Sequence, residues 1–363
     1  MATPRVHIIG GFLGSGKTTA IAAASRILIQ RGVKVGVVTN DQGRYLVDTL
    51  FFEMEKVPTV EVTGGCFCCN YDDFEERLSA LDKAARPEII FAESVGSCAD
   101  VVATVIQPLL QLSDSGYVPS SFSVFGDSRL LRQRLEGGAM PFSEEVVYIF
   151  DKQLEEAGQI VVSKADLQDE DDLEKLLLRV KARFPGKQVL IQNTLAEDGV
   201  QPWLSSIESG SFVVPKPLDE IDYEIYGAGE AELAWLDREV SLDLNGGDGH
   251  DVIQDVLSGI ETEVRARAWP VGHLKFIVES GGQRAKVSVT TADAMAPKKA
   301  LPPIQGGRVN LLINARVAAP KEDLDRLVQK VIEDVAEKRN ICWQSGSHSS
   351  FHPSYPRPTH RVS

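Results

Sequence analysis

The sequence predicts an α/β fold in which a parallel sheet with helices on both faces is followed by a smaller α+β domain. In the first half of the chain, short β-branched runs alternate with longer helical patterns, which is typical of consecutive βαβ units. A glycine-rich loop directly follows the first apolar run, at residues 10–16. In the last third, strand patterns follow one another with few helices between them, as in an α+β domain.

The elements of the first half follow the apolar runs in order. Strands are expected at 6–9, 35–39, 89–92, 123–125, 159–163 and 188–192, with helices that include 18–30 and 74–84. An acidic stretch punctuated by proline and glycine interrupts this alternation at 213–235. We therefore expect one domain at 1–212 and a linker at 213–235.

The second domain is expected at 236–342. Its strands are predicted at 239–244, 274–279, 285–291 and 309–315, and its helices at 251–267 and 321–338. This β-α-β-β-β-α order indicates a ferredoxin-like α+β domain. The remaining residues, 343–363, contain no acidic residue and are rich in Ser, Pro and His, so an irregular tail is expected there.

Composition restricts the kinds of partner. The 363 residues carry a formal net charge of -14 with a sequence pI near 5.0, which disfavours binding to nucleic acid or to an anionic membrane. No apolar run approaches the roughly 20 residues of a spanning helix, and the first residues show no signal-peptide pattern. A cytoplasmic protein with small-molecule and protein partners is expected, and the sequence leaves a homodimer open.

The glycine-rich loop carries a phosphate-binding motif. Residues 11–18 match G-x-x-x-x-G-K-[ST] between a strand and a helix, the context that a P-loop requires. Lys17 is expected to reach the β and γ phosphates and Thr18 to bind Mg²⁺. A dinucleotide loop would need a small residue where Thr19 stands. The expected nucleotide-binding residues of this loop are Gly11, Gly14, Ser15, Gly16, Lys17, Thr18 and Thr19.

Three further strand ends face the same edge of the predicted sheet. Glu93 ends a buried strand and is the candidate Walker B carboxylate for Mg²⁺, which makes it the third predicted catalytic residue beside Lys17 and Thr18. Gly96 is expected to offer its N–H to the γ-phosphate. An earlier strand ends in the polar turn 39–43, where Asp41 is placed to hold a metal ion or water.

A later strand ends in Ser163, Lys164, Ala165 and Asp166, which is similar to the NKxD loop that reads guanine. A carboxylate at Asp166 can accept hydrogen bonds from both N1–H and N2–H₂ of guanine, and adenine offers no such pair. Lys164 is expected to lie over the base. Ser163 stands where Asn is usual, so one polar contact with the base is shortened or lost. The loop therefore favours guanine over adenine but does not make the preference strict.

Three of the five cysteines, Cys66, Cys68 and Cys69, lie within four positions after a Gly-Gly pair. Thiols this crowded favour one soft or borderline ion, and Zn²⁺ accepts sulfur-rich tetrahedral sites. Cys98 and Cys342 are isolated in the sequence and are interpreted as small buried apolar residues. Candidates for the fourth coordination position of the ion are Asp41, a water molecule and a histidine of the stretch 347–360.

The motifs together resemble the CobW-type metallochaperone GTPases, which are relatives of the nickel-insertion GTPases UreG and HypB. The matching stretches are 10–19, 40–43, 65–69, 93–96 with Asp100, and 163–166. The resemblance implies GTP hydrolysis with Mg²⁺, coupled to the handling of Zn²⁺ or sometimes Co²⁺ or Fe²⁺. Asp41 departs from the Glu that is usual in the family, and Ser163 departs from its Asn.

The sequence thus predicts a GTPase that binds a transition metal at the Cys66, Cys68 and Cys69 loop and passes it to a client protein. Two alternatives stay open. One is a GTPase that assists a cobalamin- or metal-dependent enzyme, with the thiols as a sensor. The other is a P-loop kinase for a small molecule, in which the cysteines are structural.

Overall fold

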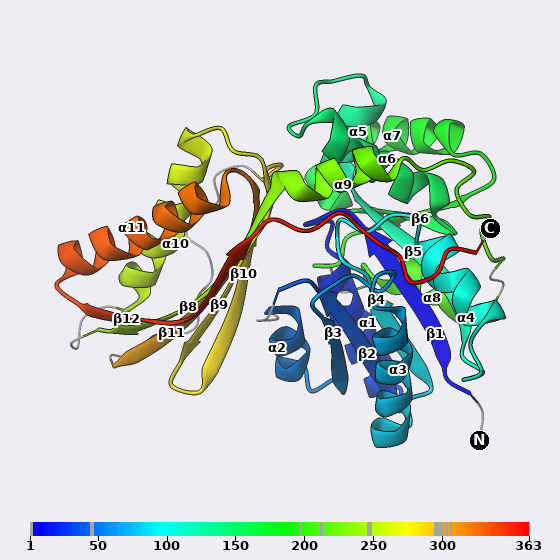
Figure 1. Ribbon diagram of the computed structural model, residues 1–363, viewed down its shortest axis with the longest axis horizontal. Coiled ribbons are helices and arrows are strands. Elements are labelled where there is room, and N and C mark those ends of the chain that lie inside the picture. The colour runs from blue at the N-terminus through cyan, green and yellow to red at the C-terminus, as the bar shows by residue number, and fades with distance from the viewer. Residues whose placement is uncertain are drawn as a thin grey trace. The chain divides into compact units, whose positions relative to one another are not determined.

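A computed structural model describes residues 3–43, 47–196, 198–210, 213–244, 249–293, 301, 304 and 307–362. The chain forms two compact units, each with its own sheet (Figure 1). The larger unit comprises Met1–Gln42, Asp48–Gly229 and Tyr355–Ser363, and the smaller unit comprises Gly43–Val47 and Glu230–Ser354.

The larger unit is built on a seven-stranded parallel sheet with the order β3-β2-β4-β1-β5-β6-β7. Its strands are β1 (Arg5–Gly11), β2 (Val35–Asp41), β3 (Thr59–Thr63), β4 (Ile89–Glu93), β5 (Val118–Asp127), β6 (Gln159–Ser163) and β7 (Gln188–Gln192). Because parallel strands all end at one edge, the loops that follow β1, β2, β4 and β6 gather at that edge.

Helices cover both faces of this sheet. They are α1 (Lys17–Gln30), α2 (Val47–Met54), α3 (Tyr71–Ala85), η1 (Val102–Ile106), α4 (Gln107–Gln111), α5 (Ser128–Leu135), α6 (Glu144–Glu156), η2 (Ala165–Leu167), α7 (Glu170–Arg183), α8 (Gln201–Glu208) and α9 (Tyr223–Glu232). One face packs on α1 and α8, with Trp203 fully buried. Glycines in the strands make room on the sheet for side chains of α3 and α5, since a Cβ at Gly36 would lie 2.8 Å from Leu81.

The predicted α/β fold is confirmed, with three local differences. The helix α2 and the strand β3 were not expected, and β5 is longer than the predicted 123–125. The start of β5 was hidden because Pro119 and two serines stand among its apolar residues.

The smaller unit is an α+β domain with an antiparallel sheet. Its elements are β8 (Leu233–Asp243), α10 (Gly249–Ala266), β9 (Val271–Ser280), β10 (Gln283–Val289), β11 (Arg308–Ala318), α11 (Lys321–Arg339) and β12 (Cys342–Phe351). The sheet order is β10-β9-β11-β8-β12. Without the edge strand β10 this is the ferredoxin-like arrangement of two βαβ halves. The core lies between the sheet and the apolar sides of α10 and α11.

Two stretches differ from the expected divisions of the chain. Residues 342–351 form β12 instead of starting an irregular tail, because a Ser-rich edge strand can pair its backbone without showing an alternating apolar pattern. Within the expected linker, Tyr223–Glu232 is helical and β8 already begins at Leu233. Residues 211 and 212, where the first domain was expected to end, lie outside the described residues.

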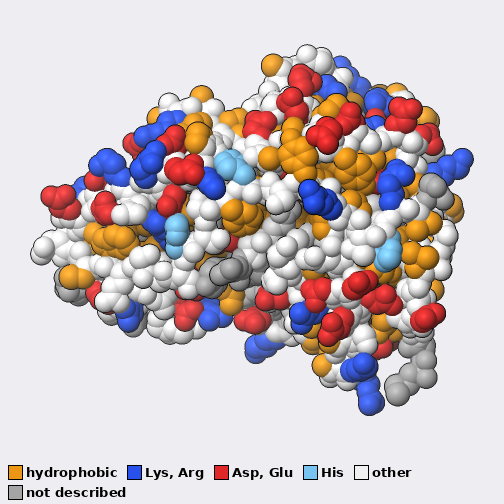
Figure 2. Space-filling view, viewed as in Figure 1, with side chains coloured by type: hydrophobic (Ala, Val, Ile, Leu, Met, Phe, Trp, Pro, Cys, Tyr) orange, Lys and Arg blue, Asp and Glu red, His pale blue; other side chains and the backbone are white. Residues whose placement is uncertain are grey.

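Within the described part of the chain, no helix is both long and apolar enough to cross a membrane. Figure 2 shows Lys and Arg side chains interspersed with Asp and Glu on one face of the molecule. The charge on this face is therefore mixed and not gathered into a patch of one sign.

Candidate nucleotide and metal site

The loop between β1 and α1 has the backbone of a phosphate cradle. Gly14 and Gly16 adopt positive φ angles of 72° and 91°, a conformation that side chains other than glycine rarely allow. A Cβ on Gly16 would meet no atom within 4 Å, so the loop borders open space. The buried hydroxyl of Ser15 has no hydrogen-bond partner among the residues that the structure describes. An orphaned donor at the start of a helix fits a phosphate oxygen.

Lys17 and Thr18 begin α1 and are both buried. The Lys17 ammonium donates to the carbonyl of Gly11 at 2.6 Å, which folds its side chain back across the loop. The Thr18 hydroxyl donates to Glu93 Oε1 at 2.9 Å. These two oxygen groups from α1 and β4 form a pair of hard donors, the kind that Mg²⁺ prefers.

The loop after β4 lies directly against the phosphate loop. A Cβ on Gly96 would lie 2.9 Å from Leu13 Cα, so only glycine allows this approach. Gln153 of α6 also holds this loop in place, because its amide donates to the carbonyls of Gly96 at 3.0 Å and Cys98 at 2.8 Å. The position of Gly96 is therefore defined by contacts on two sides.

The candidate base-reading loop follows β6. The Ser163 hydroxyl lies 2.7 Å from the carbonyl oxygen of Ser15, so this side chain links the base-reading loop to the phosphate loop. Asp166 is exposed in η2. The Lys164 ammonium lies 3.0 Å from Asp127 Oδ2 at the end of β5. Burial by itself would raise the pKa of Asp127, but its contacts with Arg129 and Lys164 outweigh burial and lower the pKa.

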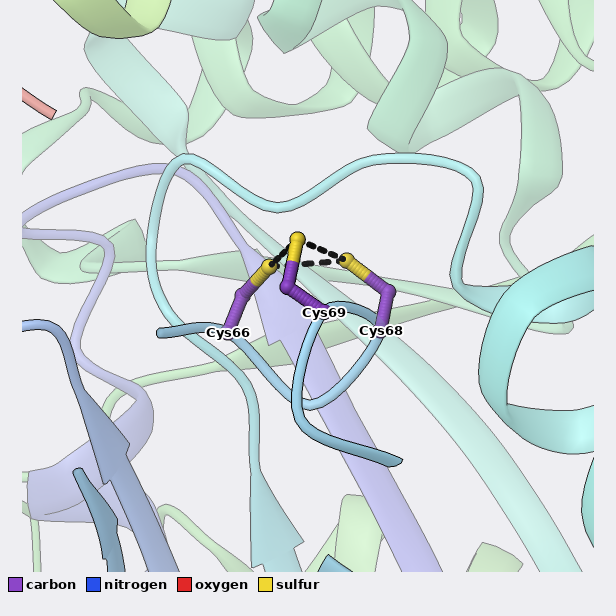
Figure 3. A group of neighbouring side chains, drawn as sticks. All are labelled: Cys66, Cys68 and Cys69. Carbon is purple, nitrogen blue, oxygen red and sulfur yellow. Dashed lines mark hydrogen bonds between the residues drawn. The ribbon is translucent and has the colours of Figure 1, made fainter. Parts of the chain in front are cut away.

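The three cysteines of the loop between β3 and α3 point their sulfur atoms at one another (Figure 3). The sulfur of Cys66 lies 2.7 Å from that of Cys68 and 3.2 Å from that of Cys69, and the third distance is 3.8 Å. Thiolates on one tetrahedral Zn²⁺ with Zn–S bonds of about 2.3 Å stand about 3.8 Å apart. The cluster therefore fits a single ion after a small expansion.

The thiols of this cluster do not titrate alike. Hydrogen bonds with Cys68, Cys69 and Cys98 lower the pKa of Cys66, so Cys66 is the first thiol to become a thiolate. The hydrogen bond with Cys66 raises the pKa of Cys69 to about 12. A cation bound among these sulfur atoms would instead lower the pKa of Cys69, because a positive charge favours the thiolate.

Cys98, on the loop that follows β4, is buried, as its interpretation as a small apolar residue expects. Its sulfur is not among the donor atoms that lie within 4.8 Å of one another in the thiol loop. In Figure 3 the loop that leaves β4 runs past the three sulfur atoms. Cys342, interpreted as buried, is instead exposed on β12.

Asn40, at the end of β2, holds the thiol loop in place. Its amide nitrogen donates to the carbonyl of Gly65 at 2.7 Å, and its amide oxygen accepts from the N–H of Phe67 at 2.8 Å. The end of β2 and the thiol loop are thus joined by one buried side chain.

Residues 355–362, which belong to the larger unit, also bond to the thiol loop. The backbone N–H of Arg357 donates to Cys69 Sγ at 3.2 Å. The N–H of Thr359 donates to the carbonyl of Cys68 at 2.8 Å, and its hydroxyl donates to that of Cys69 at 3.0 Å. His360 stacks edge-on against Tyr71 at the start of α3.

The other predicted ligands do not join the thiols. Among the described residues, only Cys66, Cys68 and Cys69 form a group of three or more donor atoms within 4.8 Å of one another. Asp41, at the end of β2, is not part of that group, and neither is His360. Asn40 and the segment 355–362 were missed, since only tertiary structure brings them to the loop.

The first strand, its glycine loop and the buried Lys17 and Thr18 define the nucleotide-binding domain of a P-loop protein. The chain belongs to the CobW/HypB/UreG family, whose nucleotide-binding domain matches residues 5–191. The family predicted from the motifs is thereby confirmed.

Two relatives of the chain are named zinc chaperones. Identity is 27% over 207 residues to zinc chaperone CobW of a Sinorhizobium species, a match that covers 51% of this chain and 57% of that protein. Identity is also 27% over 191 residues to zinc chaperone YjiA of Escherichia coli K12, with 50% and 55% covered. The chain thus matches little more than half the length of each relative.

A weaker likeness exists among solved structures. The crystal structure of the hydrogenase maturation factor HypB from Archaeoglobus fulgidus superposes with a TM-score of 0.39 at 15% identity, covering 57% of this chain and 89% of that one. The family assignment stands on the sequence match alone.

Proposed function

We propose that this protein is a GTP-hydrolysing metallochaperone. It binds a transition metal, zinc first, at Cys66, Cys68 and Cys69, and couples its nucleotide state to the transfer of that metal to a client protein. The family match to residues 5–191 and the converging thiols support this proposal. The names of the two zinc-chaperone relatives favour zinc over cobalt and iron.

In this proposal the nucleotide half of the site works by positioning. The glycine loop and Lys17 hold the phosphates, Gly96 senses the γ-phosphate, and Asp166 reads guanine. Thr18 and Glu93 hold Mg²⁺, which neutralises charge on the β and γ phosphates when bound. The unpartnered Ser15 hydroxyl and the 2.9 Å Thr18–Glu93 contact support this assignment.

The proposed coupling between the bound nucleotide and the bound metal rests on one observation. The side chain of Asn40 bonds to the thiol loop on both sides of Cys66. Asn40 is the next-to-last residue of β2 and lies directly before Asp41, in the predicted turn 39–43, which in this proposal responds to the nucleotide. A movement of that turn on GTP hydrolysis would displace Gly65 and Phe67, and with them the sulfur of Cys66. The affinity of the thiols for a metal ion would then depend on which nucleotide is bound.

A zinc competition titration tests this. The wild-type protein is titrated with Zn²⁺ against a chelator, once with a non-hydrolysable GTP analogue and once with GDP, and we expect zinc affinities that differ by about tenfold or more. Asn40→Ala should reduce this ratio towards one. Asn70→Ala is the matched control, because the Asn70 amide bonds within the same region, to the carbonyl of Thr63 on β3.

Equal zinc affinities in the two nucleotide states would disprove the coupling even if zinc binds. Loss of zinc binding in a Cys66, Cys68 and Cys69 triple serine variant is required as well. GTP and ATP turnover without any acceptor separates the proposal from a kinase. A protein that turns over ATP only when a phosphate acceptor is added would be a kinase with structural cysteines.

A further inference from the structure

We propose that the buried ion pair between Asp237 and Arg316 anchors the far end of the turn 39–43, so that the state of the nucleotide reaches the sheet of the smaller unit. This inference rests on the proposed response of that turn to the nucleotide, and it makes Asp237 and Arg316 positioning residues for the response. Both residues lie outside the matched nucleotide-binding domain at residues 5–191.

The ion pair lies on the face of the smaller sheet that points away from α10 and α11. These helices cover one face of the sheet (Figure 1), and Leu236 and Ala315 belong to the core beneath them. Successive side chains of a strand point to opposite faces, so the next residues, Asp237 and Arg316, point to the other face. Both side chains are 0% exposed, with Arg316 Nη1 2.9 Å from Asp237 Oδ1. Two charges are costly to bury unless polar groups surround them.

Neighbouring strands hold the carboxylate of Asp237 in place. The amide of Asn314 on β11 donates to Asp237 Oδ1 at 2.7 Å. The amide oxygen of Asn314 lies 2.7 Å from His273 Nε2 on β9. The guanidinium of Arg316 lies 3.9 Å from the centre of the Trp235 ring on β8. The ion pair is therefore part of a buried network that holds the carboxylate against rotation.

Gly43, the last residue of the turn 39–43, lies against this ion pair. Gly43 is buried and belongs to the smaller unit, whereas Gln42 belongs to the larger unit. A Cβ at Gly43 would overlap Asp237 Oδ2 and lie 3.1 Å from Arg316 Nη2. Because the carboxylate is held in place, only glycine lets the backbone lie so close to it. The chain thus runs from Asp41, at the end of β2, to the ion pair within two residues, and a shift of Asp41 changes the surroundings of the pair.

Fluorine NMR of the full chain labelled with 5-fluorotryptophan tests this inference. The Trp235 ring stacks on the guanidinium of Arg316 and reports on the ion pair. Trp269 and Trp343 pack on the core at the helix side of the sheet and serve as internal references. We expect the Trp235 resonance to differ between a non-hydrolysable GTP analogue and GDP, each with Mg²⁺, and the two reference resonances to stay in place. Single Trp→Phe variants assign the signals.

Gly43→Ala should abolish this difference, because the added methyl group forces the turn away from the ion pair. Both nucleotides should then give one Trp235 resonance. Asp325→Asn is the matched control, since Asp325 of α11 pairs at 2.9 Å with the buried Arg238 of the same sheet. It should leave the difference intact. Circular dichroism checks the fold of each variant, and the comparison of the two wild-type spectra stands even if Gly43→Ala fails to fold.

The outcomes separate this inference from the proposed function. A single Trp235 resonance for both nucleotides in wild type, or a difference that survives in Gly43→Ala, would overturn the anchor, even with zinc affinities that depend on the nucleotide. Equal zinc affinities together with a nucleotide-dependent Trp235 resonance would disprove the coupling to the metal and leave the anchor intact. A protein that binds neither nucleotide would overturn both.

Discussion

The guanidinium of Arg361 lies 2.8 Å from the carboxylate of Asp100, whose side chain is fully buried at the end of the loop that follows β4. The Tyr223 hydroxyl of α9 donates to the same carboxylate at 2.7 Å. Next to this pair, the N–H of Val362 donates to the carbonyl of Ala103 at 2.8 Å. The segment 355–362 is thus anchored on the Cys98 loop and also bonds to the thiol loop.

Arg361→Ala is expected to loosen this segment. Asp100 would lose its charged partner and keep the hydrogen bond from Tyr223, at a cost to stability of about 2 kcal/mol. Cys69, which the segment covers, should react faster with a thiol reagent such as Ellman's reagent. Arg326→Ala serves as the control, because the Arg326 side chain is 73% exposed and pairs with Asp323 of its own helix. Unchanged reactivity of Cys69 in Arg361→Ala would show that the segment does not shield the thiols.

Asp166→Asn is expected to change which base the protein binds. An asparagine can accept from N1–H of a purine and donate to an oxygen at C2, so it suits xanthine better than guanine. GTP affinity should fall about 100-fold or more and xanthosine triphosphate affinity should rise. Fluorescent-nucleotide competition measures both. Asp169→Asn, at the start of α7, should leave the preference unchanged. A GTP affinity unaffected by Asp166→Asn would remove this residue from the base site.

The fold and the cysteine cluster were predictable because their signals are local. The phosphate loop is a contiguous motif between a strand and a helix, and Cys66, Cys68 and Cys69 are neighbours in the chain. Their spacing alone forces the sulfurs close together. The same holds for Glu93, because a buried strand with a terminal carboxylate must present that group at the sheet edge.

The roles of Asn40 and Arg361 could not be predicted, since each depends on a partner that only tertiary structure supplies. Asn40 bonds across 25 positions to Gly65, and Arg361 pairs across 261 positions with Asp100. The strand β12 was missed because edge pairing with β8 satisfies its backbone while its side chains remain mostly polar.

Glu93→Gln is expected to impair hydrolysis more than nucleotide binding. The amide keeps the volume of the side chain and its contact with Thr18 but removes the negative charge that favours Mg²⁺. We expect GTP turnover to fall about 100-fold and the Mg²⁺ concentration for half-maximal rate to rise. Glu88→Gln, just before β4 at the other end of the strand, is the matched control. Wild-type turnover in Glu93→Gln would exclude Glu93 as the Mg²⁺ ligand.

His7, in the central strand β1, should make the larger unit sensitive to acid. Burial, assisted by the charge of Arg5, lowers the pKa of His7 to about 3. Below pH 6.5 the unfolded chain binds a proton at this residue that the folded chain does not, so stability falls as pH falls from 6.5 towards 3. Between pH 7 and pH 5 this one group should lower the free energy of unfolding by about 2 kcal/mol.

His7→Gln should remove that part of the acid sensitivity, since glutamine does not titrate and can still bond to the Ser121 hydroxyl, which lies 2.8 Å from His7 Nδ1. Urea unfolding of both proteins at pH 7 and pH 5 measures the difference. If the variant lost as much stability over this range as wild type, His7 would have to be protonated in the folded protein. Because His7 lies on the strand that leads into the phosphate loop, saturating GTP should offset part of the loss in wild type through its preference for the folded state.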